Sequence, residues 1–330
     1  MSPTLRLSVI VPVFNEEACI AELIGRTTAV LDAIAGGPHE LIFIDDGSRD
    51  ETPRLLERAA AGDGRIVVVQ LSRNFGHQAA LTAGLDYATG DAVVILDGDL
   101  QDPPEAIPQL LQRFQEGYDV VYVERRNRKE PWPLRFCYWL FYRMLAKLSD
   151  THLPIDAGDF GLLSRRVVEE LRGMTEHHRY MRGLRSWVGF RQVGVPVERV
   201  SRAAGKSKYS LWGLIKLATD GLVAFSTVPL RAAMVVGLIA IGAAVLFSAY
   251  STILRLLGSP PRGFTALTLL ITFLSGVNLF SLGIIGEYVG RIYDETKARP
   301  LYVVGRVINA QGNTSVRSQA AAAVTGNSPR

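Results

Sequence analysis

The sequence predicts an α/β fold with a doubly wound, mainly parallel sheet, followed by two transmembrane helices. The sheet is predicted because short, β-branched apolar runs alternate with helix-length segments along the first part of the chain. The transmembrane helices are predicted because residues 232–254 and 264–286 are uncharged and apolar over 23 residues each. At about 1.5 Å per residue, each stretch can cross a hydrocarbon core of about 30 Å.

The strands are expected where apolar runs are bounded by glycine or by polar turn residues. Five are predicted first, at residues 7–13, 40–45, 66–71, 92–96 and 119–124. A helix that opens at residues 15–17 and ends near Gly36 follows the first strand. Beyond the fifth strand we expect a loop entering a strand at 156–163, a helix at 164–171 and a strand at 191–200.

An acidic run follows the most apolar of these strands. Asp97 and Asp99 are two residues apart, so their side chains can converge on one hard cation, and Gly98 leaves room for a ligand. Asp102 is expected to cap the next helix, with Glu105 completing a capping box. An acidic turn with only this capping role is the alternative. Polar residues at 15–17 and 45–46 end two other strands, and parallel strands would bring all three ends to one crevice.

Two segments indicate contact with the membrane. Residues 132–148 mix aromatic rings with cations, which is typical of an interfacial amphipathic helix, although a helix packed into the domain has the same composition. Residues 202–209 form a basic loop with Lys206 and Lys208. Such a loop suits either a phosphate group at the membrane surface or anionic lipid headgroups.

The patterns divide the chain into a globular domain (1–227), two transmembrane helices (228–290), a juxtamembrane segment (291–308) and a disordered tail (309–330). The domain and both termini are expected in the cytoplasm. The apolar run at 9–14 is too short for a signal peptide, and six Lys or Arg residues flank the spans against two in the connecting loop. A net charge of +4 argues against nucleic-acid binding, and two cysteines are too few for a disulfide framework or a zinc site.

Five motifs in order resemble those of the family 2 polyprenyl-phosphate glycosyltransferases, which include undecaprenyl-phosphate glucosyltransferases and dolichol-phosphate mannose synthases. The motifs are PVFNEE (12–17), DDGS (45–48), SRNFGH (72–77), DGDLQDPP (97–104) and GKSKY (205–209). The resemblance implies a GT-A fold and transfer of a hexose, with inversion, from a nucleotide sugar to a polyprenyl phosphate. It further implies UDP-glucose and undecaprenyl phosphate as substrates, a divalent Mg²⁺ or Mn²⁺ cofactor, a bacterial inner-membrane location and a homo-oligomer. GDP-mannose and a UDP-aminoarabinose derivative remain alternative donors.

The same resemblance assigns roles to individual residues. Asp97 and Asp99 would bind the metal, and Asp159 matches a carboxylate near the acceptor. The residues implied for donor binding are Pro12, Asn15, Glu17, Asp46, Arg73, Asp97 and Gln101, and those implied for phosphate or acceptor binding are Arg125, Arg128, Lys206, Lys208 and Tyr209. Relatives commonly have arginine where this chain has Gly161, so either Arg125 or Arg165 supplies the charge, or the acceptor is handled differently.

Two other functions are weighed against this one. A processive polysaccharide synthase of the same superfamily would carry a Gln-x-x-Arg-Trp motif, which this chain lacks. A membrane-tethered sensor that binds a nucleotide sugar without turnover would be expected to have lost part of the acidic pair, whereas Asp97 and Asp99 are both present.

Overall fold

A computed structural model describes residues 5–126, 157–177, 179–198, 228–257 and 263–310. They fall into two units, of which the first holds the described residues up to 198 and from 299 to 310, and the second holds 228–257 and 263–298. The predicted interfacial helix at 132–148 and the basic loop at 202–209 lie outside the described residues.

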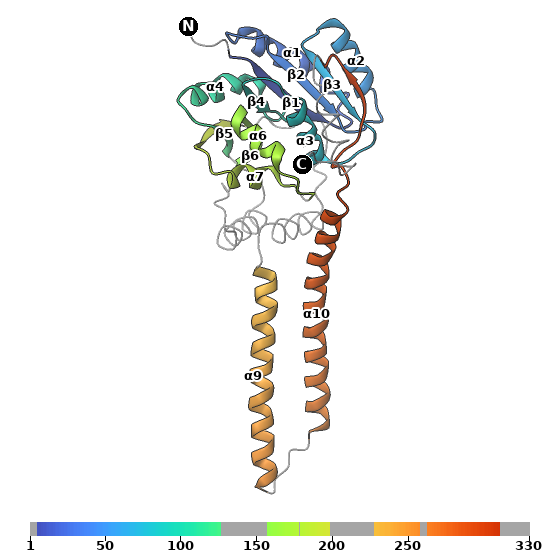
Figure 1. The fold of residues 1–330 in the computed structure, drawn as a ribbon, viewed down its shortest axis with the longest axis vertical. Coiled ribbons are helices and arrows are strands. Elements are labelled where there is room, and N and C mark those ends of the chain that lie inside the picture. The colour runs from blue at the N-terminus through green and yellow to red at the C-terminus, as the bar shows by residue number, and fades with distance from the viewer. Residues whose placement is uncertain (1–4, 127–156, 178, 199–227, 258–262, 311–330) are drawn as a thin grey trace, which may run out of the picture. The chain divides into compact units, whose positions relative to one another are not determined.

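The first unit is built on one sheet of eight strands in the spatial order β7, β5, β6, β4, β1, β2, β3, β8 (Figure 1). The strands are β1 (Leu7–Val13), β2 (Glu40–Asp45), β3 (Ile66–Leu71), β4 (Ala92–Ile95), β5 (Val120–Arg126), β6 (Ala157–Ser164), β7 (Gln192–Glu198) and β8 (Val304–Ile308). The helices of this unit are α1 (Ile20–Ala33), α2 (Thr52–Gly62), α3 (His77–Tyr87), the 3-10 turn η1 (Pro104–Ala106), α4 (Ile107–Gln115), α6 (Arg165–Gly173) and α7 (Met181–Trp187).

The sheet confirms the α/β class but is mixed. Parallel pairing joins β1 to both β2 and β4, β2 to β3, and β5 to β7. β6 lies antiparallel between β4 and β5, and β8 lies antiparallel to β3. Because β1 to β4 are parallel, their carboxyl ends meet at one edge of the sheet, as the sequence predicts.

The core has two layers because side chains of a strand alternate between the two faces of the sheet. Val9 belongs to one layer and Ile10 to the other, and both are fully buried. Leu23 of α1 packs into the first layer and Leu81 of α3 into the second. The helices on both faces thus hold the carboxyl edge of the sheet in place.

The predicted capping box at Asp102 and Glu105 is wrong. The chain enters η1 at Pro104, and α4 begins only at Ile107, without a side-chain cap. Glu105 instead accepts two hydrogen bonds from Arg26 of α1, at 2.9 and 2.8 Å. Asp102 is buried beside the acidic run.

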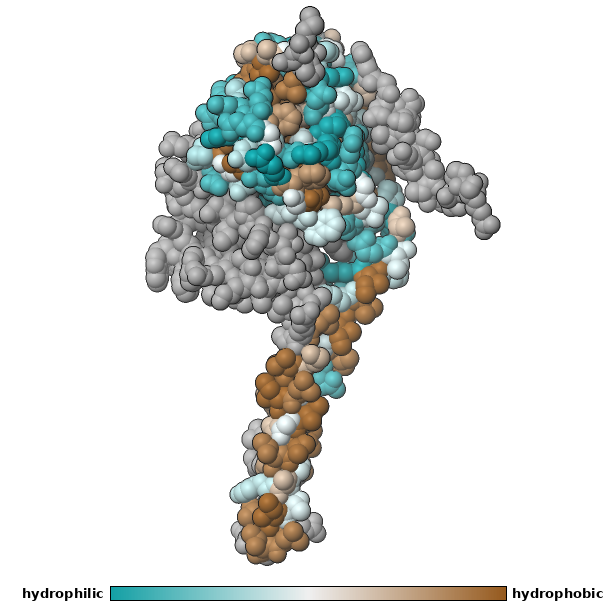
Figure 2. Space-filling view, turned by 60° about the vertical axis from the view of Figure 1, so that its left-hand side comes forward, coloured by the Kyte–Doolittle hydropathy of each residue, from teal (hydrophilic) through white to brown (hydrophobic). Residues whose placement is uncertain are grey.

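The second unit contains the two long apolar helices α9 (Val228–Leu256) and α10 (Phe264–Thr296). By length and composition they carry candidate membrane spans at Ala233–Leu254 and Phe273–Thr296. Large apolar side chains such as Leu246 and Phe280 are exposed along them, and the brown surface in Figure 2 follows the same helices. Side chains of this kind are stable in lipid rather than in water.

β8 lies within the stretch that the sequence predicts as a juxtamembrane segment, 291–308. It forms the edge of the sheet beside β3, so this part of the chain belongs to the first unit.

Candidate active site

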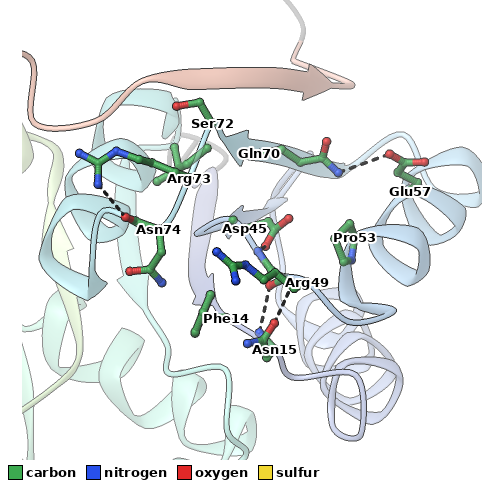
Figure 3. A pocket seen from close by; sticks show the side chains of 13 residues that line it. Phe14, Asn15, Asp45, Arg49, Pro53, Glu57, Gln70, Ser72, Arg73 and Asn74 are labelled. Carbon is green, nitrogen blue, oxygen red and sulfur yellow. Dashed lines mark hydrogen bonds between the residues drawn. The ribbon is translucent and has the colours of Figure 1, made fainter.

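A pocket of about 590 Å³ opens at the carboxyl ends of β1, β2 and β3 (Figure 3). Loops after these strands and the amino-terminal half of α2 form its walls. The lining residues are Phe14, Asn15, Asp45, Gly47, Ser48, Arg49, Pro53, Glu57, Gln70, Leu71, Ser72, Arg73 and Asn74. Two of the residues predicted to bind the donor, Asn15 and Arg73, are among them.

Asn15 joins two of these loops. Its backbone has a positive φ of 55°, which asparagine tolerates better than most residues. The Asn15 amide donates to Ser48 Oγ at 3.0 Å, and Asn15 Oδ1 accepts from the Arg49 amide at 2.8 Å. The loops after β1 and β2 therefore form one connected wall.

Gly47 allows the loops after β2 and β3 to approach each other. A Cβ at this position would lie 2.6 Å from the Arg73 carbonyl carbon, and Gly47 also has a positive φ of 71°. Only glycine fits both conditions without displacing the backbone that carries Arg73.

The two aspartates at the end of β2 have different roles. Asp45 lines the pocket, and its Oδ1 accepts from the Ser48 amide at 2.9 Å. Asp46, which the resemblance implies as a donor contact, is buried and does not line this pocket. Its carboxylate accepts from the amides of Phe75 and Gly76 at 2.7 and 2.9 Å, and so fixes the start of α3.

The other predicted donor residues are not among those that line the pocket. Pro12 is buried within β1, and Glu17 accepts from the Glu51 amide at the start of α2, at 3.0 Å. Gln101 donates its backbone N–H to Asp99 Oδ1 at 3.1 Å. Arg73, which does line the pocket, stacks on the Phe75 ring, with its guanidinium 4.2 Å from the ring centre.

A second group of charged residues lies at the end of β4. The antiparallel register pairs Ile95 of β4 with Gly161 of β6. Two residues further along this register, Asp97 lies opposite Asp159. The Asp97 side chain is 18% exposed and that of Asp159 is 9% exposed. A Cβ on Gly98 would lie 2.9 Å from the Pro12 carbonyl oxygen, so this glycine accommodates the β1 backbone rather than a ligand.

Arg182 and His77 both contact Asp159. Arg182 of α7 binds it through two hydrogen bonds, Nε to Oδ1 at 2.7 Å and Nη2 to Oδ2 at 2.8 Å. His77, the first residue of α3, places Nε2 3.6 Å from Asp159 Oδ2 and 4.0 Å from Asp97 Oδ1. The imidazole therefore lies between the two carboxylates.

These contacts separate the pKa values of the two aspartates. Burial, followed by the charge of Asp159, raises the pKa of Asp97 to about 6, although His77 acts in the opposite direction. Burial also opposes ionisation of Asp159, but the hydrogen bonds from Arg182 and the contact with His77 outweigh it and hold that pKa far below its usual range. Partial burial disfavours protonated His77, yet the Asp159 and Asp97 carboxylates raise its pKa. Asp159 thus stays ionised, while the pKa of Asp97 is raised.

A divalent cation beside Asp97 would offset the burial and the carboxylate charges that raise its pKa. Asp97 and Asp99 offer the hard oxygen ligands that Mg²⁺ and Mn²⁺ prefer. In the part of the chain that the structure describes, no group of three or more Asp, Glu, His or Cys residues has the arrangement of a complete metal site. Mg²⁺ commonly binds proteins through one or two carboxylates and completes its coordination with ligand oxygens or water, and the Asp97 and Asp99 pair suits such binding.

The missing cation at Gly161 has a structural explanation. A Cβ at Gly161 would lie 2.6 Å from the Val121 carbonyl oxygen, so β5 and β6 leave no room for a side chain. Arg165 cannot replace it, since its guanidinium donates to the carbonyls of Ala88 and Gly90. Arg182 is the arginine that contacts Asp159.

Some predicted phosphate-binding residues cannot be placed. Arg128, Lys206, Lys208 and Tyr209 lie outside the described residues, and for Arg125 only the backbone at the end of β5 is described. Conversely, sequence reasoning assigned no role to His77 or Arg182. His77 ends the SRNFGH motif, which was a usable signal, whereas Arg182 is 23 residues from Asp159 and has no local signal.

The chain is similar to known glycosyltransferases over most of its length. Residues 8–172 match the family model described as glycosyl transferase family 2. The chain is 41% identical to "Uncharacterized glycosyltransferase YkcC" of Bacillus subtilis, covering 97% of this chain and 99% of that protein. It is 40% identical to "Bactoprenol glucosyl transferase" of Shigella phage SfX, covering 91% and 99%. It is 36% identical to "Undecaprenyl-phosphate 4-deoxy-4-formamido-L-arabinose transferase" of Aeromonas hydrophila, covering 92% and 94%.

Proposed function

The chain belongs to glycosyltransferase family 2, and from this premise we propose that it transfers a hexose from a nucleotide sugar to a polyprenyl phosphate. The observation that carries the proposal is the position of the Asp97, Asp159, His77 and Arg182 cluster at the same sheet edge as the pocket. A donor that spans both places has its nucleoside in the pocket and its sugar near the two carboxylates.

The nucleotide pocket is assigned to the loops after β1 to β3. Arg49 and Arg73 line it and suit an anionic ligand, and Asp45 and Asn15 offer groups for the base or ribose. Asp97 and Asp99 would hold the divalent cation, whose chemistry is to neutralise charge on the departing diphosphate. Gln101, which binds Asp99 through its backbone, would keep that carboxylate in place.

The acceptor's chemistry explains the environment of Asp159. A phosphate monoester has a second pKa of about 6, so it is already a dianion near neutral pH and needs no general base. Asp159 is paired with Arg182 and His77 and keeps its charge, which suits orienting cations rather than removing a proton. We assign phosphate binding to Arg125, Arg128, Lys206, Lys208 and Tyr209.

The sugar is proposed to be glucose, from UDP-glucose, with undecaprenyl phosphate as acceptor. The support is the 40% identity to a protein named bactoprenol glucosyl transferase. A second candidate, a UDP-aminoarabinose derivative, is favoured by the 36% identity to the formamido-arabinose transferase.

The location is proposed to be the bacterial inner membrane, spanned by α9 and α10, with the domain and both termini in the cytoplasm. The two candidate spans are the support for membrane attachment. A polyprenyl phosphate is a membrane lipid, so membrane attachment of the chain suits this acceptor. We also propose a homo-oligomer.

The test uses the purified full chain with undecaprenyl phosphate and a panel of radiolabelled nucleotide sugars. Label from UDP-glucose should move into the solvent-extractable lipid as a single sugar, and the Asp99→Asn variant should not support it. Transfer from UDP-aminoarabinose or GDP-mannose alone would select the alternative donor. Long sugar chains would indicate a processive synthase, and binding without transfer would indicate a sensor.

The acceptor assignment has its own test. Neutralising Lys206 and Lys208 together should raise the KM for the lipid far more than the KM for the nucleotide sugar. An equal rise in both constants would place these lysines over the donor diphosphate instead.

A further inference from the structure

The strand that follows the second apolar helix lies beside β3, and the end of β3 lines the nucleotide pocket. β8 pairs antiparallel with β3, with Gln70 opposite Arg306 and, after a shift in register, Leu71 opposite Val304. The Ser72 amide donates to the Val303 carbonyl at 2.8 Å, which extends this contact onto the pocket lining. Figure 3 shows the strand running past Ser72 at the rim of the pocket.

Three side chains anchor this segment to the helices on both faces of the sheet. Tyr302 donates its hydroxyl to Asp86 Oδ2 of α3 at 2.6 Å. Asn309 donates to the Ala60 carbonyl of α2, also at 2.6 Å. The third anchor, Arg306, donates from Nη1 to Glu57 Oε1 at 2.7 Å.

Glu57 is the anchor point that belongs to the pocket. It lies on α2, lines the pocket, and its Oε1 also accepts from Gln70 Nε2 at 3.3 Å (Figure 3). The Glu57 side chain is 37% exposed, so part of its charge faces solvent and the ligand space. A carboxylate in this position repels a nucleoside diphosphate, which carries several negative charges.

We propose that Arg306 is a positioning residue for the donor nucleotide, because it neutralises Glu57 and holds that carboxylate against Gln70. The inference rests on the proposed assignment of this pocket to a nucleoside diphosphate. Arg306 does not touch the ligand itself. It acts through Glu57, from a strand that the chain reaches only after α10.

The ion pair is well suited to this role because it contributes little to the fold. Both side chains are partly exposed, at 62% for Arg306 and 37% for Glu57, and pairs of this kind contribute little to stability. Loss of Arg306 should therefore leave the protein folded while exposing the charge of Glu57 to the ligand. An uncompensated carboxylate in the lining of the pocket should weaken binding of a nucleoside diphosphate by about threefold to tenfold at low salt.

The experiment measures the dissociation constant of UDP and the steady-state constants on the full-length protein in detergent, at low salt. Arg306→Ala should weaken UDP binding and raise the donor KM by about threefold to tenfold, with kcat within about twofold of wild type. Arg306→Lys, which keeps the charge, should remain close to wild type. The double variant Arg306→Ala with Glu57→Gln should recover most of the lost affinity. Raising the salt concentration should shrink the defect of Arg306→Ala.

The matched control is Arg54→Ala. Arg54 forms a similar exposed ion pair with Glu51 on the same helix, at 2.8 Å, but it does not line the pocket. Its UDP affinity should equal that of wild type. A defect in Arg306→Ala that the double variant does not repair, or that persists unchanged in high salt, would overturn the electrostatic role. Normal UDP binding by Arg306→Ala would do the same.

The outcome also separates this inference from the proposed function. If wild-type protein fails to bind UDP or any other nucleoside diphosphate, the assignment of the pocket is wrong and the role of Arg306 is lost with it. If wild-type protein binds UDP and Arg306→Ala binds it equally well, only the inference about Arg306 is wrong.

Discussion

Replacing Asp97 with asparagine should stabilise the protein while abolishing its activity. Asp97 is enclosed beside the ionised Asp159, and burial followed by this neighbouring charge raises its pKa from 3.8 to about 6. A carboxyl with a raised pKa in the folded state destabilises the fold once it ionises, because the unfolded chain holds the same charge in water. Asparagine keeps the size of the side chain and removes the charge.

The size of the effect follows from the difference in pKa. A difference of about two, at about 1.4 kcal/mol for each unit, sets an upper limit of about 3 kcal/mol at neutral pH. This pKa already includes the attraction between Asp97 and His77. Relaxation of the buried site around the charge reduces the effect, so a gain of about 1–3 kcal/mol is expected. For a domain of this size, that gain corresponds to roughly 2–10 °C in the apparent melting temperature.

The pH dependence distinguishes this cause from a general improvement in packing. Below about pH 4, Asp97 is protonated in both the folded and the unfolded chain, so wild type and Asp97→Asn should melt together. Between pH 4 and pH 6 the wild-type carboxyl ionises more readily in the unfolded state, and wild type loses stability relative to the variant. Above about pH 7 the difference should be constant.

The assay is thermal unfolding of the full chain in detergent with EDTA, from pH 4 to pH 8, for wild type and Asp97→Asn. Addition of Mn²⁺ should stabilise wild type near neutral pH and leave the variant unchanged. A variant that melts below wild type at pH 7.5, or a difference that does not vary with pH, would refute the reasoning about charge.

Three further substitutions probe the site and its frame. Asp99→Asn should lower turnover by several orders of magnitude with little change in melting temperature, and full turnover in excess EDTA would contradict a metal role. Arg182→Ala should destabilise the protein by about 3 kcal/mol, because Asp159 then keeps a poorly compensated charge. Arg182→Lys keeps the positive charge and should lose less stability. Equal melting temperatures of the two variants would contradict the ion-pair argument. Gly161→Ala should lower the free energy of unfolding by about 1–3 kcal/mol, because the added Cβ forces β5 and β6 apart. A Cβ at Gly25 meets nothing within 4 Å, so Gly25→Ala should be neutral or stabilising. Denaturant titration measures both effects.

The sequence predicts part of this site because the alternation of strands and helices indicates a mainly parallel sheet, whose strands end at one edge. Apolar runs ending in polar residues identify Asn15 and Asp97 as neighbours at one sheet edge, since parallel strands end together. The register between β4 and β6 is not a local property, so the contact of Asp97 with Asp159 and the bond from Arg182 could not be predicted. The sequence motif identifies the pair Asp45 and Asp46, but only the geometry of the loop shows that Asp45 lines the pocket and that Asp46 accepts a hydrogen bond from the Phe75 amide.

The strand β8 could not be predicted from the sequence, for a different physical reason. Five residues with two inward-packing valines, after a long apolar helix, carry too little periodicity to indicate a strand. What places them in the sheet is the unpaired edge of β3 and the anchors at Tyr302 and Asn309.

If α9 and α10 span the membrane as proposed, the place of β8 in the sheet links maturation of the domain to insertion of these two helices. Val68 pairs with Ile308, so the last strand joins a partner made 240 residues earlier, after both apolar helices have left the ribosome. Until then the β3 edge has no strand beside it and can pair with other chains. Only chains that bring residues 304–308 back to the side where β3 lies can close this edge. Molecules in which only one of the two helices crossed the membrane would keep an open strand edge, which would expose them to aggregation or proteolysis.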